Sequence, residues 1–348
     1  MRALTVVASL VAAVAAVVAA ALTAIRNAPE FASSLATPFY GWPPLRGDFE
    51  PVAPSSPLLA LHLPVYFTPF HAFPLDIFAL QVDEASNAWL ISDAGSPDTP
   101  LQSHATETVA AVTRLLARVS TLRKAATLSH ILLSHGHWDH VGALHSLLDA
   151  FPSSVVVFHE AEADMTLHGT SWENHTWKDA SYGGVGARLA GATVYPSEPN
   201  VLRPFPADRA VLLTGTSGAV PGVPALTWHH TPGHAPSHIV MSIPALKLLL
   251  GGDVADVISD PARDVPLPDG RVLRKGVPGA YTLAYLRGAD RAAADASLCR
   301  VAHDVEGVPY DLILPYHNAL RRPIPRAEFA RLADGAAGGC PEWTGKSI

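Results

Sequence analysis

The chain has 348 residues and a mass of 36.7 kDa, which is enough for one large domain or two smaller ones. Apolar residues make up 49% of it and charged residues only 16%, a composition that excludes global disorder. The formal net charge is -7 and lysine and arginine form no dense stripe, so the sequence predicts no nucleic-acid-binding surface.

The N-terminal segment, residues 1–26, is predicted to be a signal peptide or a membrane anchor. An uncharged run rich in alanine and valine fills residues 3–25, between Arg2 and Arg26. The run is longer than an ordinary signal-peptide core and close to the length of a helix that spans a bilayer. Its alanine and valine make it only weakly hydrophobic per residue, so both interpretations stay open, and the symmetric arginines do not settle its orientation. Either one predicts a secretory-pathway protein, secreted or membrane-anchored, that touches a membrane only through this segment.

Residues 27–76 are predicted to form a Pro-rich strap or linker. Prolines, glycines and serines recur there among aromatic side chains, without the periodicity of a strand or a helix. We therefore expect regular structure to begin near Ile77 and the main domain to span residues 77–320.

Strand and helix patterns alternate in the first half of that domain. Two short apolar segments around the polar residues 83–87 predict a β-hairpin. Apolar residues at helical spacing predict a helix over 106–122. A buried strand over 129–133 is followed by a predicted helix and by a strand within 153–160. This order is typical of a layered α/β fold.

The second half returns to strands after an irregular stretch. Residues 162–207 are predicted to be an insertion over the working face, and residues 321–348 a C-terminal tail. Between them the sequence predicts strands at 210–213, 226–230, 238–242, 247–250 and 310–316, with a helix near 290–305.

The densest motif is "HGHWDH", residues 135–140, directly after a predicted strand. Alternate side chains of an extended backbone share a face, so His135 and His137 can point at one ion. Asp139 and His140 begin the next helix, where the chain reverses, and can face a second ion. A motif of this length supplies at most four ligands, so further ligands are expected at the ends of later strands.

Three later motifs meet that expectation. His234 lies in "TPGH" after a strand, Asp253 follows an apolar strand in "GGD", and His317 follows another in "PYH". Asp93, in "SDAG", also follows an early strand. Taken in order, these motifs resemble the metallo-β-lactamase-fold hydrolase superfamily, in the HxHxDH branch with a bridging aspartate that includes lactonases and glyoxalase II-like enzymes.

The resemblance implies an αββα sandwich, in which two mixed β-sheets are flanked by helices. It also implies two divalent metal ions, one held by His135, His137 and His234 and the other by Asp139, His140 and His317, with Asp253 bridging. Imidazole and carboxylate ligands suit Zn²⁺, and also iron or manganese. By the same resemblance Asp139 is the catalytic residue that orients the nucleophile, and Asp93 supports a metal ligand without binding the metal itself; the alternative for Asp93 is a simple turn residue.

The function implied is metal-dependent hydrolysis of an ester, lactone or thioester in a small-molecule substrate (EC 3.1-type), by a hydroxide shared between the metals. His140 and Asp253 disfavour the β-lactam-hydrolysing branch that has a cysteine at the second metal, although β-lactam hydrolysis stays an alternative. The others are a mononuclear iron dioxygenase of the persulfide type and a non-catalytic binding protein on the same fold.

Two further features fit the secretory route. Asn174 begins an "NHT" glycosylation acceptor sequence. Cys299 and Cys340 are the only cysteines, and they form either one disulfide or two unrelated thiols. The oligomeric state is left open.

Overall fold

The computed structural model of the chain describes residues 47–68, 71–98, 103–122, 124–163, 206–257, 265–266, 272–273, 280–281, 290–303, 310–318, 322–336 and 340. Residues 1–46, which include the predicted leader, lie outside this part, as do most of the predicted insertion and Asn174. Among the described residues, none of the helices combines the length and the apolar character needed to cross a bilayer.

The first half of the described chain contains these elements: β1 (Glu50–Pro51), β2 (Leu59–Thr68), β3 (His71–Asp83), β4 (Ala88–Ser92), α3 (His104–Val119), β5 (Thr127–Leu132), α4 (Trp138–Val141), α5 (Leu144–Ala150), β6 (Val155–His159) and the 3₁₀ turn η1 (Glu160–Glu162). The second half contains η2 (Ala207–Arg209), β7 (Ala210–Leu213), β8 (Ser217–Val220), β9 (Val223–His230), β10 (Ile239–Ile243), η3 (Pro244–Leu246), β11 (Leu248–Gly252), β12 (Asp256–Val257), β13 (Val265–Pro266), β14 (Val272–Leu273), β15 (Ala280–Tyr281), α9 (Arg291–His303), β16 (Leu312–Pro315), β17 (Ile324–Pro325) and α10 (Arg326–Ala336).

Most of the described strands form two large mixed sheets, as the sequence predicts, while β12 pairs with β15 and β13 with β14 in two separate small sheets. The first large sheet runs in the order β1-β2-β3-β4-β5-β6-β7, and the second in the order β17-β16-β11-β10-β9-β8. In the first sheet β4, β5, β6 and β7 are parallel, while β1 to β4 are antiparallel. In the second sheet only β11 and β16 are parallel.

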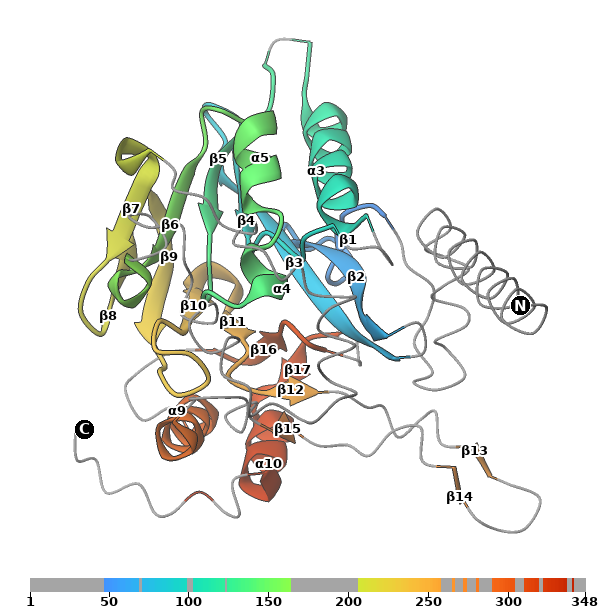
Figure 1. Ribbon diagram of the computed structural model, residues 1–348, viewed down its shortest axis with the longest axis vertical. Coiled ribbons are helices and arrows are strands. Elements are labelled where there is room, and N and C mark those ends of the chain that lie inside the picture. Colours follow the sequence, from blue (N-terminus) through green and yellow to red (C-terminus); the bar gives the residue numbers. More distant parts are fainter. Residues whose placement is uncertain are drawn as a thin grey trace, which may run out of the picture.

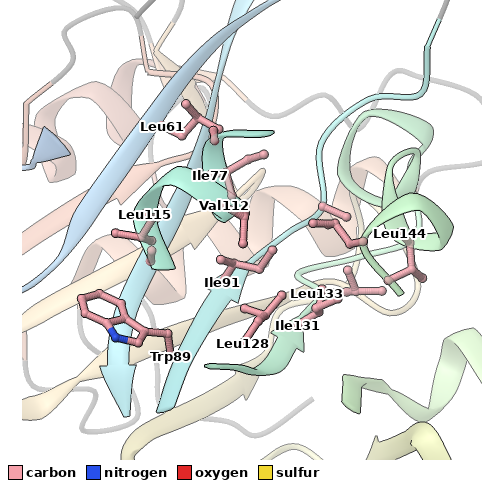
Figure 2. Packing of buried hydrophobic residues seen from close by; sticks show 14 of the residues in the cluster. Leu61, Ile77, Trp89, Ile91, Val112, Leu115, Leu128, Ile131, Leu133 and Leu144 are labelled. Carbon is pink, nitrogen blue, oxygen red and sulfur yellow. The ribbon is translucent and has the colours of Figure 1, made fainter. Parts of the chain in front are cut away.

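Three apolar clusters fill the spaces between the layers and hold them together. One lies between the first sheet and the helices α3 and α5, with Ile77, Ile91 and Val112 fully buried (Figure 2). A second fills the space between the two sheets. The third joins the second sheet to α9 and α10. Figure 1 shows the resulting order, with α3 and α5 beside the first sheet and α9 and α10 beside the second. This is the αββα sandwich expected from the sequence.

The prediction of an irregular strap over residues 27–76 is wrong from Glu50 onward. Residues 59–68 and 71–83 form the antiparallel pair β2 and β3, in which Pro64 is opposite Pro74. Proline has no backbone N–H, so it is tolerated where one side of a strand has no partner. Within the described chain β1 pairs with β2 only at Leu59 and Ala60, which leaves that side of β2 open at Pro64.

The prediction of a C-terminal tail over residues 321–348 is also wrong in part. Residues 324–325 form the edge strand β17, and α10 follows at once. Phe329 and Ala333, one helical turn apart, are fully buried in the third apolar cluster. This burial anchors the helix against the second sheet. The domain therefore extends at both ends beyond the predicted residues 77–320.

Candidate metal centre

The "HGHWDH" motif folds as a short extended segment followed by one helical turn. β5 ends at Leu132, and the backbone is still extended at His137, where φ is -69° and ψ is 150°. α4 then places Asp139 and His140 on its first turn. The extended segment presents His135 and His137, and the turn brings the next two side chains back towards them, as the spacing predicts.

The later predicted residues come from loops of the second sheet. β9, β11 and β16 run in the same direction, because β10 is antiparallel to both β9 and β11 and β16 is parallel to β11. Their carboxyl ends therefore lie at one edge, and they are followed by His234, Asp253 and His317 respectively. The backbone N–H of Ile239 donates to the carbonyl of Ser134 at 2.9 Å, which ties this edge to the end of β5.

The seven side chains form two groups of potential metal ligands. The ligand atoms of His135, His137, His234 and Asp253 all lie within 4.8 Å of one another, and so do those of Asp139, His140 and His317. All seven residues are buried. The structure thus brings together every residue that the sequence assigns to the metals.

Asp253 lies between the two groups. Its Oδ2 is 3.4 Å from His234 Nε2 and 3.7 Å from His135 Nε2, in the first group. The same oxygen is 3.2 Å from His140 Nε2 and 3.1 Å from His317 Nε2, in the second group. One carboxylate oxygen therefore faces potential ligands of both groups, where a carboxylate shared by two ions would lie.

The protonation states of the first group fit metal binding. Burial, followed by the neighbouring imidazoles, holds the pKa of His135 and of His137 well below the usual value. Both rings are therefore neutral and have lone pairs for a metal. His135 Nε2 and His234 Nε2 face each other at 3.1 Å, a contact that a cation between two lone pairs would stabilise.

The charges of the second group also call for a cation. Burial disfavours a charge on His140, yet the carboxylates of Asp253, Asp139 and Asp93 raise its pKa well above the usual value. Burial also opposes ionisation of Asp253, but His140 and His317 hold its pKa well below the usual range. In the described structure His140 Nε2 lies 3.2 Å from Asp253 Oδ2 without a hydrogen bond of regular geometry, and Asp253 Oδ1 is buried without a hydrogen-bond partner. A divalent cation would neutralise these buried carboxylates and give such atoms a partner.

Asp93 orients the ring of His140 from the side opposite Nε2, and is not merely a turn residue. Its Oδ2 is 2.5 Å from His140 Nδ1. Ser134 donates its backbone N–H to Oδ1 and its hydroxyl to Oδ2, both at 2.7 Å. Asp93 has a φ of 64°, in the left-handed region that aspartate tolerates better than most residues. The carboxylate therefore fixes the ring of His140 with Nε2 directed at Asp253.

His238 is a supporting residue that the sequence analysis did not assign. Its Nε2 accepts the backbone N–H of Asp253 at 2.8 Å, so the ring proton is on Nδ1, next to the Thr231 hydroxyl at 2.7 Å and the Thr231 carbonyl at 3.1 Å. Burial lowers the pKa of His238 to about 3, which keeps the ring neutral. A side chain at Gly252, where φ is +51°, would come within 2.6 Å of this ring. The second glycine of "GGD" therefore makes room for His238. Its only sequence signal was a position four residues after His234.

We expect His238→Ala to weaken metal binding by roughly 10–100-fold, because the backbone at Asp253 loses the acceptor that fixes it. His238→Gln offers a side-chain oxygen to the same N–H, so its loss should be smaller. Competition for zinc against a chromophoric chelator measures both affinities. Equal affinities for His238→Ala and the unmodified chain would show that Asp253 is held without this histidine.

Glu162 is a second supporting residue that the sequence analysis missed. Its side chain is buried and its Oε1 accepts the hydroxyl of Ser237 at 2.9 Å. A Cβ added at Gly136 would collide with Glu162 Oε2. The carboxylate therefore lies against the backbone between the first two histidines of the motif, and that contact requires glycine.

Gly136→Ala should destabilise the fold by about 1–3 kcal/mol, the usual cost of overpacking a buried position. In a Glu162→Ala background the same change should cost clearly less, because the clashing carboxylate is gone. Thermal or urea unfolding of the two single variants and the double variant measures this coupling. Strictly additive losses would rule out the contact as the reason for glycine.

The remaining predicted features have mixed outcomes. Cys299 and Cys340 are joined in a disulfide, so the first of the two interpretations of these cysteines is confirmed. Asn174 lies outside the described residues, and its glycosylation stays a prediction.

Comparisons with known proteins identify a family for the chain. Residues 107–299, more than half of the chain, match the sequence model described as the Metallo-beta-lactamase superfamily. The uncharacterized protein YobT of Bacillus subtilis (strain 168) is 30% identical over 128 residues, which are 36% of this chain and 46% of that protein. The match thus spans less than half the length of that relative.

The solved structures that match the chain have low sequence identity to it. A metallo-beta-lactamase family protein from Thermus thermophilus is 20% identical, with a TM-score of 0.48 over 80% of this chain and 77% of that one. The metallo-beta-lactamase FIM-1 from Pseudomonas aeruginosa, in a mono-zinc form, is 16% identical, with a TM-score of 0.49 over 83% of this chain and 96% of that one.

Proposed function

The chain belongs to the metallo-beta-lactamase superfamily, whose members are largely hydrolases, and we propose that it is a dinuclear metal-dependent hydrolase acting on an ester, lactone or thioester. One observation carries the proposal. Asp253 Oδ2 faces nitrogens of both ligand groups at 3.1–3.7 Å, as a carboxylate shared by two ions would.

The donor set defines which residues would hold the metals. His135, His137 and His234 would bind one ion, Asp139, His140 and His317 the other, and Asp253 both. When bound, such a pair supplies Lewis acidity and an activated water at neutral pH. Zinc suits these imidazole and carboxylate donors, and iron and manganese accept the same donors. Neither group contains a cysteine, so the donor set gives no reason to expect a soft metal that prefers thiolate ligands.

Asp139 is the residue proposed to handle the proton. Its Oδ2 lies 3.4 Å from His317 Nε2 and 3.7 Å from His140 Nε2. Burial opposes its ionisation, but the neighbouring His140 and His317 lower its pKa, so it is a carboxylate able to accept a proton. In the reaction, water oxygen forms a bond to the carbonyl carbon and the C–O or C–S bond breaks. Asp139 orients the water, takes its proton and returns a proton to the leaving oxygen or sulfur.

The other buried residues hold this arrangement before substrate binds. Asp93 fixes the ring of His140, and His238 fixes the backbone that carries Asp253. His317 Nδ1 lies 2.6 Å from the carbonyl of Pro74, which orients its Nε2 towards the centre. Preorganised partners of this kind reduce the rearrangement needed during reaction.

The proposed substrate is a small molecule rather than a nucleic acid, because the chain has a net charge of -7 and no dense stripe of lysine and arginine. The histidine after the motif aspartate, His140, and the later Asp253 favour branches with a bridging carboxylate over the branch that uses a cysteine.

We also propose that the chain works on the secretory route, as a secreted or anchored enzyme. The apolar run at residues 3–25 supports this, and so does the Cys299–Cys340 disulfide, because such bonds persist in oxidising compartments.

The test is hydrolysis of a panel of aryl esters, aliphatic lactones and acyl thioesters by the zinc-loaded chain. We expect activity towards at least one class that disappears with a chelator and returns with added divalent metal. A folded, metal-loaded chain that hydrolyses none of the three classes would contradict the proposal. Metal-dependent oxygen uptake with a persulfide substrate would replace it with the dioxygenase.

A further inference from the structure

A further set of potential metal-ligand side chains, separate from both groups of the candidate metal centre, lies where α9 and α10 meet. Cys299 and His303 are four residues apart on α9, Asp334 is on α10, and Cys340 follows α10. The ligand atoms of His303, Asp334 and Cys340 lie within 4.8 Å of one another. Cys299 is not in that group, but its Sγ is bonded to Cys340 Sγ and lies directly beside it.

We call this set of four side chains the α9–α10 corner. Its side chains lie close together, and several of them are partly exposed. His303 Nε2 lies 2.8 Å from Asp334 Oδ1, and these side chains are 38% and 47% exposed. Cys299 is buried, whereas Cys340 is partly accessible. Residues four apart on a helix lie on the same face, so Cys299 and His303 are directed to one side of α9. Solvent, a metal ion or a thiol can therefore reach the corner from outside.

The donor types are those of a tetrahedral zinc site. Zinc binds thiolate, imidazole and carboxylate, and structural sites usually have four protein ligands. Zn–S and Zn–N or Zn–O bonds of ordinary length separate the ligand atoms of a tetrahedron by about 3.3–3.8 Å. The spread of up to 4.8 Å among His303, Asp334 and Cys340 is close to that size. Cys299 Sγ, which lies outside this spread, would complete the tetrahedron once the disulfide opens and the exposed His303 and Asp334 side chains move towards it.

We propose that this corner binds a zinc ion, through Cys299, His303, Asp334 and Cys340, when its disulfide is reduced. Zinc would then replace the disulfide as the link between α9 and Cys340. This site shares no residue with the hydrolytic centre and the proposal does not rest on the proposed function.

A dithiol can reduce the Cys299–Cys340 disulfide by thiol–disulfide exchange. One thiolate of the dithiol attacks the accessible Cys340 Sγ, the disulfide breaks, and Cys299 leaves as a thiolate. The second thiol of the reductant attacks the mixed disulfide and releases Cys340, so that the dithiol becomes a disulfide. Two electrons and two protons pass to the chain. Zinc then displaces the protons from both thiols.

The link matters because α9 holds a loop of the hydrolytic centre. Ser297 donates its hydroxyl to the carbonyl of Pro232 at 2.7 Å, and Arg300 donates to the carbonyl of His230. A side chain at Gly233 would collide with the backbone of Ala294. These contacts lie on the loop that carries His234. A metal link would keep α9 in place in a chain that is still reduced.

Cobalt spectroscopy of the full chain tests the site. Cys299 and Cys340 are the only cysteines in the sequence, so thiolate-to-cobalt absorption in the near ultraviolet arises from this corner alone. The chain is reduced with a phosphine, the phosphine is removed without air, and Co²⁺ is added. We expect the band to appear in the reduced chain, to saturate at one thiolate-bound Co²⁺ per chain, and to be absent from the oxidised chain.

Variants separate the site from two thiols acting alone. His303→Ala and Asp334→Ala each remove a ligand and leave the disulfide intact, so their folding is checked in the oxidised state. They should lose the band at cobalt concentrations that saturate the unmodified reduced chain, whereas the exposed control Asp208→Ala should keep it.

Thermal unfolding checks whether the reduced chain keeps its fold and whether cobalt stabilises it. Cobalt should raise the melting temperature of the reduced chain more than that of reduced His303→Ala/Asp334→Ala. The proposal fails if reduction gives no thiolate band, if the band is as strong in that double variant, or if both reduced proteins gain equal stability from cobalt.

Discussion

Replacing Asp139 by Ala is expected to lower kcat/KM for the hydrolysed substrate by roughly 10²–10⁴-fold, the range that a positioned acid-base group contributes. The carboxylate is buried and lies beside His140 and His317, where no other described carboxylate except Asp253 faces the same nitrogens. With Asp253 occupied as the shared oxygen, nothing would remain to orient the water and take its proton. Initial rates over a range of substrate concentrations measure the loss.

A ligand role and a proton-transfer role for Asp139 can be told apart. Asp139→Asn keeps the size and an oxygen donor but cannot accept a proton, so activity should fall while metal content stays nearer that of the unmodified chain. Asp208→Asn, at an exposed carboxylate, is the matched control and should change neither. Full activity of Asp139→Ala would remove Asp139 from the mechanism.

Asp253→Asn should have the largest effect on metal binding. The carboxylate faces four imidazole nitrogens, and removing its charge leaves both groups without the shared anion. Loss of one partner of a buried charge pair costs about 3–5 kcal/mol, which corresponds to at least roughly 10²-fold in affinity. Competition with a chromophoric chelator should show weakened binding of both ions together.

The pattern of loss is the informative part of that experiment. His137→Ala, in contrast, removes a ligand of the first group only, so it should weaken one ion and spare the other. If Asp253→Asn weakened one ion alone, Asp253 would be an ordinary ligand of that ion, and the bridging position would be wrong.

The central layers could be predicted because their patterns are strong and local. The hairpin of β3 and β4, the helix α3 and the strands β5, β6, β10 and β11 all follow from buried apolar runs or helical spacing. The order of strand, histidine motif and helix placed His135 to His140 at a strand end. A chemical argument about ligand number then led to His234, Asp253 and His317.

The edges of the fold escaped prediction for physical reasons. Prolines in residues 27–76 suggested a strap, but an open strand side tolerates Pro64, and only the neighbouring chain shows that the side is open. α10 is a short helix whose stability comes from burying Phe329 and Ala333 on a distant sheet. Such tertiary burial is not contained in a local pattern. Pro325, directly before the helix, is a local signal that favours a helix start at Arg326.

The supporting residues of the site were the hardest to see. His238 and Glu162 bind neither substrate nor metal in this account, and they act on the backbone at Asp253 and at Gly136. Nothing in their neighbouring sequence marks that role, because it depends on segments far apart in the chain. The small residues beside them, Gly252 and Gly136, are the trace that they leave in the sequence.

The most direct test of the account is the metal content of the oxidised chain, measured by elemental analysis after purification without chelator. With the disulfide intact, the corner at Cys340 contributes no thiolate, so the count reports the candidate metal centre around Asp253. We predict close to two divalent ions per chain, and a clear decrease in Asp253→Asn. A folded chain that holds no metal and refuses added zinc, or one that holds a single iron, would contradict the dinuclear centre.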